Sequence, residues 1–382
     1  MEHDLRGKAA CVGLAHAGMG EAHGRNAMEI MVEAVHGALE DAHIPLSEVD
    51  GVFAASAFFS MAGMSLSEHL GIQPKFSDGS NIGGSSFMGH ALLATMALEL
   101  GLCNVAVIAY GSNQRTAGGF KSISEPPPFE TVYGPRNPIT AYALAASRYM
   151  YQFGATREHL AEVAVAARAW AKLNPEAFER GDLTIEDVLN ARMISDPLGK
   201  LDCCLVTDGA AAIVMTRADR AKEGPNKPVY LLGCAIEHHH RMISAMPDLT
   251  VTAAAKSGPR AFDMAGYKPA DMDTIQLYDA FTINTILFLE DLGYCAKGEG
   301  KDFVSDGGIA PGGRLAVNTN GGGLSCVHPG MYGLFVMIEA IRQIRGKCGA
   351  RQIDGAKLSV AHGNGGVLSS QVTTVWGAPE TV

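Results

Sequence analysis

The 382-residue sequence predicts an α/β fold in which one structural unit is repeated, and three observations lead to this prediction. Short apolar and β-branched runs alternate along the chain with stretches whose apolar residues recur at helical spacing. Residues 37–56 and 260–279 match each other without a gap. Hydrophobic residues make up 47% of the chain and charged residues only 18%, a composition typical of a large, well-buried core.

The first half of the chain shows the alternation most clearly. Strands are predicted for CVGLA, VDGVFAA and NVAVIAYG, with helices between them near 26–44 and 86–100. From residue 113 to about 200 the pattern breaks into segments rich in Gly, Ser and Pro, so we expect an insertion there that carries helices near 139–153 and 157–173. The strand DGAAAIVMT, at 208–216, follows the insertion.

A polar segment marks the boundary between the two halves. The stretch RADRAKEGPNKP is charged, contains two prolines and precedes the apolar strand VYLLGCAI, so it is the best candidate for a linker. We therefore divide the chain into an N-terminal half, residues 1–225, with the insertion at about 113–200, and a C-terminal half, residues 226–382.

The internal match supports this division. Both segments follow the order helix, turn, aspartate, strand, and three pairs are identical: Ala38 with Ala261, Ala42 with Ala265, and Asp50 with Asp273. A Gly-rich loop and a helix also precede a strand in each half, before NVAVIAYGS and before KLSVAHGNGG. Two such parallels in the same order predict a duplicated α/β unit whose strand ends and helix N-termini meet at one site.

Charge and cysteine usage exclude several function classes. The net charge of −10, without a basic stripe, argues against nucleic acid or a membrane surface as a partner. The N-terminus lacks the apolar core of a secretory signal, and no apolar run approaches the roughly 20 residues that span a bilayer, so we expect a cytoplasmic protein. The eight cysteines show no paired C-x-x-C spacing, and the histidine run at 238–240 has no companion ligands, so no metal site is expected.

The Gly-rich turn before the helix near 86–100 is the first candidate for chemistry. Its backbone N–H groups and the helix N-terminus favour a developing negative charge, which makes Gly84 and Ser85 candidates for an oxyanion site. The structural alternative is that Ser85 or Ser86 is only an N-cap.

A second group of candidates lies in the C-terminal half. His328, between a Gly-rich loop and Pro329, suits a general base or an oxyanion donor, and Cys326 lies two residues earlier. Tyr278 and Asp279 stand where a strand ends, the edge at which active-site groups gather. His362 is followed by Gly363, Gly365 and Gly366, which allow backbone to approach a ligand closely. The alternatives are a structural histidine, a small buried thiol and an interface tyrosine.

These motifs resemble the thiolase superfamily, in particular its branch similar to sterol-carrier-protein-type thiolases. The resemblance covers essentially the whole chain and is carried by DPLGKLDCCLVTDGAAAIVMTRADRA, by QLYDAFT with LEDLGYCAKGEG, by NTNGGGLSCVHPG and by HGNGG. It implies a duplicated βαβαβαββ core with five layers, α/β/α/β/α, a loop domain over the site and assembly at least as a homodimer. It also implies activity on coenzyme A thioesters, at the carbon–carbon bond next to the thioester.

The resemblance assigns site residues one at a time. The histidine of the family's Gly-His-Pro loop falls on His328, and its Asn-Glu-Ala-Phe position falls on residues 278–281. His362 takes the place of a cysteine, and the nucleophilic cysteine of active thiolases falls on Gly84 or Ser85. Neither residue is a thiol, and a serine needs a dedicated base to become a nucleophile. Ordinary thiolysis is therefore not expected.

A further resemblance is to thiolase-fold aldolases that cleave steroid side chains as coenzyme A thioesters. In those enzymes the tyrosine matching Tyr278 is an acid/base residue, and a second catalytic tyrosine aligns at or beside His328. They are often paired with a small zinc-ribbon and OB-fold subunit, which the resemblance implies as a possible partner here. The only cofactor implied is coenzyme A as part of the substrate, with none bound covalently.

Together these inferences predict a retro-aldol or retro-Claisen step on an acyl-CoA. Tyr278, His328 and His362 would share proton transfers, backbone N–H groups near Gly84 and Ser85 or around 363–366 would stabilise the enolate, and Asp279 and Cys326 would contact the substrate. Two alternatives stay open: acyl transfer with Ser85 or Cys326 as nucleophile, and a non-catalytic subunit that binds acyl-CoA. We expect insertion residues such as Phe120, Phe129 and Tyr133 to line the acyl pocket.

Overall fold

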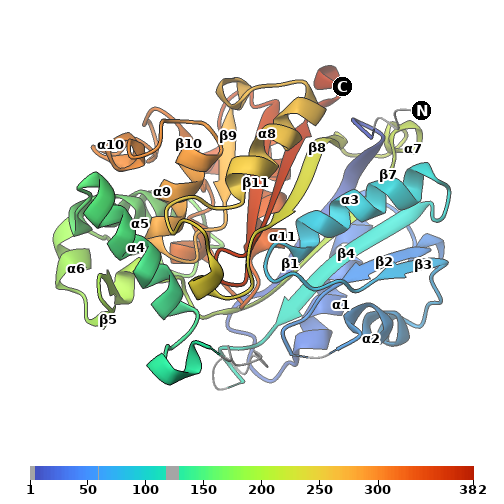
Figure 1. Ribbon diagram of the computed structural model, residues 1–382. Coiled ribbons are helices and arrows are strands. Elements are labelled where there is room, and N and C mark those ends of the chain that lie inside the picture. The colour runs from blue at the N-terminus through green and yellow to red at the C-terminus, as the bar shows by residue number, and fades with distance from the viewer. Residues whose placement is uncertain (1–4, 59, 118–128) are drawn as a thin grey trace.

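A computed structural model describes residues 5–58, 60–117 and 129–382 of the chain (Figure 1). Ten of the described strands form one mixed sheet in the order β10-β9-β11-β12-β8-β1-β7-β4-β2-β3. Their bounds are β1 Ala9–Gly20, β2 Gly51–Ala54, β3 Phe76–Asp78, β4 Val105–Ser112, β7 Asp208–Arg217, β8 Val229–His238, β9 Thr274–Leu277, β10 Ala316–Val317, β11 Leu358–Gly365 and β12 Ser370–Gly377. A separate hairpin joins β5 (Met193–Ser195) to β6 (Leu198–Gly199).

The strand order confirms the duplication. From the central β8–β1 pair, one arm runs β1, β7, β4, β2, β3 and the other runs β8, β12, β11, β9, β10. In each arm the first three strands pair antiparallel and the last three pair parallel. Each strand of one arm therefore has a counterpart at the same place in the other. The expected linker contains α7 (Ala218–Ala221), and β8 begins just after it, at Val229, so the two halves join between β7 and β8. The division at residue 225 stays a prediction.

The helices form three layers around the two arms of the sheet. Helix α1 (Ala27–Ala42) packs on β1, β7 and β4, whereas α8 (Ala254–Ala265) packs on β8 and β12. Helices α3 (Ser86–Glu99) and α11 (Gly333–Arg345) contact each other and strands of both arms. The order of layers is thus α1, one arm, α3 with α11, the other arm, α8. The predicted α/β/α/β/α arrangement is confirmed.

Close packing of the outer helices explains the matched alanines. A Cβ added to Gly13 of β1 would lie 2.1 Å from the carbonyl oxygen of Ala38, and one added to Gly233 of β8 would lie 2.0 Å from that of Ala261. In both arms a glycine on the strand leaves room for the helix backbone. The small alanine side chains on the helix keep the distance between helix and strand short.

The matched aspartates also have one structural task. Asp50 accepts hydrogen bonds from the backbone N–H groups of Asn104 (2.7 Å) and Val105 (3.0 Å), where β4 begins. Asp273 accepts from Lys357 (2.8 Å) and Leu358 (2.9 Å), where β11 begins. Each carboxylate satisfies the first N–H groups of a central strand.

The expected insertion lies between β4 and β7 and carries α4 (Ile139–Phe153), α5 (Arg157–Lys172) and α6 (Ile185–Asn190). Its start is fixed by the buried Asp208, which accepts from the backbone N–H of Arg115 at 2.8 Å and from the hydroxyl of Thr116 at 2.6 Å. Phe129 and Tyr133 are 77% and 87% exposed, so the structure does not bury these two in a pocket wall, and Phe120 lies outside the described residues. The remaining helices are α2 (Ala62–Leu70), α9 (Thr282–Asp291) and α10 (Gly300–Val304).

Within the described ranges, no helix combines the length and apolar character needed to cross a membrane.

Candidate active site

Tyr278 stands directly after β9, at the carboxyl end of a parallel strand pair. Its backbone N–H donates to the carbonyl of His362 at 3.0 Å, which continues the ladder between β9 and β11 by one residue. The side chain is 4% exposed, and its ring packs edge-on against the rings of His328 and Tyr332, with 5.6 Å between centroids in each case. The end of the strand thus delivers a phenol into a nearly closed site.

His328 reaches the same place from the loop before α11. The loop contains a π-helical turn, Gly322–Cys326. Hydrogen bonds from other parts of the chain hold both the N–H and the carbonyl of His328. The N–H of His328 donates to the hydroxyl of Thr207 at 2.9 Å, and the carbonyl of His328 accepts from the side-chain amide of Gln114 at 2.7 Å. The imidazole Nε2 lies 3.1 Å from the Tyr278 hydroxyl oxygen. The structure therefore brings the two predicted acid/base residues into hydrogen-bonding contact.

Burial keeps both members of this pair neutral. It raises the pKa of the Tyr278 phenol well above 10, and it lowers the pKa of His328 to about 4. One contact opposes the effect on the phenol, because the backbone N–H of Tyr332 donates to its oxygen at 3.1 Å and so favours the phenolate. At neutral pH the site holds a phenol beside an uncharged imidazole.

The Gly-rich turn of the first half forms the floor beneath Tyr278. A Cβ on Gly84 would lie 2.2 Å from Cε2 of Tyr278, so only glycine allows the ring to sit there. The glycines after His362 make room for the same turn: a Cβ on Gly365 would lie 1.9 Å from the carbonyl oxygen of Ile82, and one on Gly363 would lie 3.0 Å from Cα of Ser85. Gly366 is further along, where its carbonyl accepts from the hydroxyl of Tyr142 at 3.2 Å.

Ser85 faces away from the Tyr278–His328 pair. Its hydroxyl donates to the carbonyl of Ile82 at 3.1 Å and lies 2.8 Å from the hydroxyl of Ser370, and the residue is fully buried. It precedes α3, but its side chain makes no capping hydrogen bond, so the simple N-cap alternative does not describe it either. Because its partners are a carbonyl and another hydroxyl, Ser85 lacks the base that a serine nucleophile needs.

The expectation that the His362 ring joins Tyr278 and His328 needs correction. Its Nδ1 lies 2.9 Å from the Thr373 hydroxyl and its Nε2 lies 2.9 Å from Oε1 of Gln371. The ring also packs on Phe288 of α9, with centroids 4.6 Å apart. Side chains alternate along a strand, so His362 and Gly363 point to opposite faces of β11, and it is Gly363 that faces α3. Only the His362 carbonyl reaches Tyr278.

Asp279 was expected to contact the substrate, but in the structure its carboxylate bonds the backbone of the protein itself. It is fully buried, and its carboxylate accepts from the N–H groups of Gly323 at 2.6 Å and Leu324 at 3.4 Å. Burial raises its pKa to about 7. Asp279 therefore ties the end of β9 to the π-helical turn that leads to His328.

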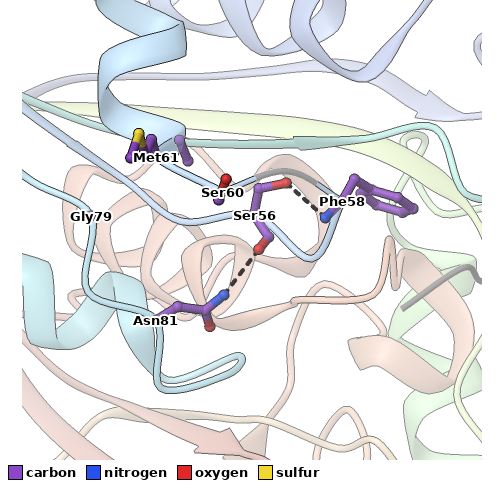
Figure 2. Close-up of a pocket in the computed structure, with 7 residues that line it drawn as sticks. Ser56, Phe58, Ser60, Met61, Gly79 and Asn81 are labelled. Atoms are coloured by element: carbon purple, nitrogen blue, oxygen red, sulfur yellow. Dashed lines mark hydrogen bonds between the residues drawn. The ribbon is translucent and has the colours of Figure 1, made fainter. Parts of the chain in front are cut away.

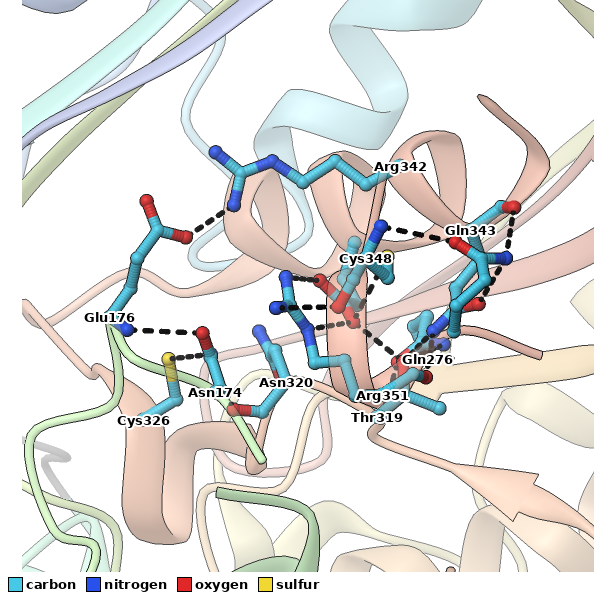
Figure 3. Close-up of polar contacts among 12 residues, drawn as sticks. Asn174, Glu176, Gln276, Thr319, Asn320, Cys326, Arg342, Gln343, Cys348 and Arg351 are labelled. Atoms are coloured by element: carbon cyan, nitrogen blue, oxygen red, sulfur yellow. Dashed lines mark hydrogen bonds and ion pairs between the residues drawn. The ribbon is translucent and has the colours of Figure 1, made fainter. Parts of the chain in front are cut away.

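Cys326 lies in a cluster of polar side chains that includes Asn174 and Asn320 (Figure 3). The side-chain amide of Asn174 donates to its sulfur at 3.5 Å, and the residue is 2% exposed. Burial raises the pKa of its thiol far above the usual range, so it is not poised to react. The same cluster holds the buried ion pair of Arg351 and Glu339, at 2.9 Å.

A surface hollow of about 610 Å³ opens beside this site but holds none of the predicted residues (Figure 2). It lies between the loops that follow β2 and β3, where the amide of Asn81 donates to the carbonyl of Ser56 at 2.9 Å. Its lining is Ser56, Phe58, Ser60, Met61, Ala62, Gly79 and Asn81. None of these side chains is an acid or a base at neutral pH, so the hollow does not supply the chemistry.

Sequence reasoning missed three residues of the site: Gln114, Thr207 and Tyr332. Two of them hold the His328 peptide, and the third donates its backbone N–H to the Tyr278 oxygen. Thr207 and Tyr332 lie inside or beside the quoted motifs, whereas Gln114 lies at the start of the insertion and carries no pattern of its own.

No group of three or more His, Cys, Asp or Glu side chains in the described parts of the chain is arranged to hold a metal ion. Of the histidine run, His240 is engaged with the carbonyl of Val367 at 2.8 Å.

Comparison with known proteins decides the family. The family described as Thiolase C-terminal domain-like matches residues 235–378. The chain is 34% identical over 360 residues to 17-hydroxy-3-oxo-4-pregnene-20-carboxyl-CoA lyase of Mycobacterium tuberculosis, and the match covers 90% of this chain and 92% of that protein. The chain belongs to the thiolase superfamily. It falls in the branch of the sterol-carrier-protein-type thiolases, close to the steroid side-chain aldolases.

Other members of the superfamily carry different activities. An acetyl-CoA acetyltransferase of Methanothermobacter thermautotrophicus is 33% identical over 384 residues, covering 94% of this chain and 96% of that protein. Among solved structures, the Ltp2-ChsH2(DUF35) aldolase superimposes with a TM-score of 0.90 at 31% identity and 98% coverage of both chains. The chain is thus a thiolase-superfamily enzyme acting on acyl-CoA, and its reaction is that of a lyase or of an acyltransferase.

Proposed function

We propose that this enzyme cleaves β-hydroxyacyl-CoA thioesters by a retro-aldol reaction that uses no covalent intermediate. The observation that carries the proposal is the contact between the Tyr278 hydroxyl and His328 Nε2, at 3.1 Å, beside a turn in which Gly84 and Ser85 offer no thiol. The lyase and aldolase names of the relatives point to the same reaction class.

The proposed step passes one proton along this pair. The β-hydroxyl of the substrate gives its proton to the Tyr278 oxygen while Tyr278 gives its own proton to Nε2 of the neutral His328. The bond between Cα and Cβ breaks, and a carbonyl forms at Cβ. The electron pair of the broken bond is delocalised into the thioester as an enolate. The same proton returns through the pair to Cα. Atoms and charge balance without an added nucleophile.

A retro-Claisen reaction on a β-ketoacyl-CoA needs a nucleophile, either the thiol of coenzyme A or water. Backbone N–H groups near Gly84 and Ser85, or around 363–366, would stabilise the enolate in either reaction. One well-placed oxyanion donor is worth roughly 3 kcal/mol.

The experiment compares substrates and variants. The enzyme is incubated with a steroid β-hydroxyacyl-CoA, chosen because the relatives' names specify steroid substrates, and both products are measured. Tyr278→Phe should lower turnover at least a hundredfold, and Ser85→Ala should leave it within about threefold. Cleavage that survives Tyr278→Phe contradicts the proposed proton path.

Acyl transfer is the second candidate, favoured by the similarity to an acetyltransferase. In it, Ser85 or Cys326 would carry an acyl group. Mass spectrometry of the protein after brief incubation with substrate separates the two, because an adduct of acyl mass appears only in this alternative. Binding of acyl-CoA without turnover of β-hydroxy or β-keto substrates would instead mean a non-catalytic subunit.

Partners belong to the proposal as well. The aldolase with TM-score 0.90 is a complex with a DUF35 protein, so we propose a small partner of that kind, with the zinc ribbon and OB-fold that the sequence resemblance implies, and the assays should be run with and without it. A homodimer and a cytoplasmic location stay predictions; light scattering of the purified protein tests the first, and localisation of a tagged chain tests the second.

A further inference from the structure

A small cavity borders Asp279, the residue that follows Tyr278. It measures about 10 Å³, and its apolar lining comes from α5, β10 and Ile309. Three polar residues complete its wall: Asp279, Thr285 and Asn318. A cavity of this size is just large enough for one water molecule, and three polar neighbours are the usual number for a buried water.

Thr285 supplies the strongest indication of a ligand. It sits on α9 and is fully buried, and its hydroxyl has no hydrogen-bond partner among the residues that the structure describes. Leaving a buried hydroxyl unpaired costs about 1–3 kcal/mol. A water in the cavity offers that hydroxyl a partner.

The other polar walls connect the cavity to the catalytic loop. Asp279 holds the N–H groups of Gly323 and Leu324, and a Cβ on Gly322 would lie 2.0 Å from its Oδ2, so carboxylate and turn are in tight contact. Asn318 accepts from the N–H of Leu277 at 2.6 Å, one residue before Tyr278. Both groups hold backbone that leads to Tyr278 or His328.

We infer that a water molecule bound by Asp279, Thr285 and Asn318 fixes the orientation of the Asp279 carboxylate, and that Thr285 is thereby a positioning residue for His328. The carboxylate has two oxygens and can rotate, and besides Gly323 and Leu324 it has the side chain of Asn318 as a hydrogen-bond partner. The water adds a further partner on the cavity side and so holds the carboxylate in the orientation that bonds the turn. Nothing in this arrangement contacts the substrate. The kinetic part of the inference rests on the proposed function, and the water itself does not.

The experiment uses matched variants of the full-length enzyme. Thr285→Val keeps the shape and removes the hydroxyl, and Thr285→Ser restores it. Thr95→Val is the control, because Thr95 is equally buried but its hydroxyl only bonds the carbonyl of Ala91 within α3, at 2.8 Å. High-resolution crystal structures of wild type and Thr285→Val, together with kcat and KM for all four proteins, are measured.

The expected result is density for one water within hydrogen-bonding distance of the three groups in wild type and its loss in Thr285→Val. Turnover should fall three- to tenfold in Thr285→Val with KM unchanged, and Thr285→Ser and Thr95→Val should match wild type. Absence of the water from wild-type density overturns the water site. Wild-type turnover in Thr285→Val overturns the positioning role. If wild type itself cleaves no β-hydroxyacyl-CoA, the proposed function fails, while the density still decides the water.

Discussion

The two arms of the sheet share one scaffold but differ at the ends of their matching strands. Strand β2 of the first arm is followed by Ala55 and Ser56, at the positions that Tyr278 and Asp279 occupy after β9 of the second. The aspartates that hold the neighbouring strands, Asp50 and Asp273, are the same in both. Residues that build the unit are therefore kept in both copies, and the residues proposed to carry the chemistry are found in one.

The connections between strands differ in the same way. In the second arm β11 turns into β12 within residues 366–369, whereas in the first arm the equivalent connection, from β4 to β7, spans residues 113–207. The first arm thus contributes the insertion and the turn at Gly84 that packs against the Tyr278 ring, and the second contributes Tyr278 and His328, the side chains proposed to transfer protons.

The largest expected effect is at His328, and His362, the other histidine named for the second arm, serves as its control. His328→Ala should lower turnover at least a hundredfold, because it removes the partner of the Tyr278 hydroxyl. His362→Asn should leave turnover within about threefold and only lower stability, because that ring bonds Thr373 and Gln371. Steady-state kinetics on both variants checks the difference. Near wild-type turnover of His328→Ala would rule out the mechanism.

The floor supplied by the first arm gives the next effect. Gly84→Ala should cost ten- to hundredfold in turnover, because the new Cβ would overlap the Tyr278 ring at 2.2 Å and force it to move. Gly89→Ala on α3 is the control, since its Cβ would make only ordinary van der Waals contacts, with Cδ1 of Ile236 at 3.5 Å and Cδ1 of Ile82 at 3.7 Å. Equal kinetics for the two variants would mean that the turn does not position Tyr278.

Asp279, which has a neutral counterpart in Ser56, should make stability depend on pH. Its folded pKa of about 7 exceeds the ordinary value of 3.8, so the folded state keeps a proton that the unfolded state has lost. The stabilisation from this bound proton is fully present below about pH 4 and is lost as the pH rises to about 7. Over that range the free energy of unfolding falls by up to about 1.4 kcal/mol per pH unit.

Urea unfolding of wild type and Asp279→Asn between pH 5 and 8 tests this point. The stability of wild type relative to the variant should fall with rising pH up to about 7 and then level off. Taking the difference removes the opposite slope of His328, whose pKa is lowered to about 4. A difference that stays constant over this range would contradict the raised pKa of Asp279.

The smallest effect is expected where the arms are alike. Asp50→Asn and Asp273→Asn should each lower the free energy of unfolding by about 1–3 kcal/mol, because each leaves buried N–H groups at a strand start without a charged acceptor. Turnover per folded molecule should not change. Asp263→Asn, on the exposed side of α8, serves as the control, and a loss of activity in only one of the two variants would break the equivalence of the arms.

The sequence predicted the duplication well because its signal is repeated: helix, aspartate and strand recur together in both halves. It predicted Tyr278 and His328 through the resemblance to thiolases. It could not place the His362 ring, because β11 is buried at every position and shows no alternation that would mark its two faces. The sequence did not show that Cys326 is buried beside Asn174 or that Asp279 bonds the turn Gly322–Cys326, since a π-helical turn has no periodic pattern to read.

Gln114 links the first few residues of the insertion to His328, the proposed acid/base residue, through the 2.7 Å bond to the His328 carbonyl. Its neighbours Arg115 and Thr116 are bonded to Asp208, so a shift of this stretch would disturb the bond that holds the His328 backbone. Under the proposed mechanism, exchange of the whole insertion between relatives would therefore alter turnover. A chimaera that keeps the histidine loop undisturbed should be spliced after Thr116, leaving that tether with the recipient.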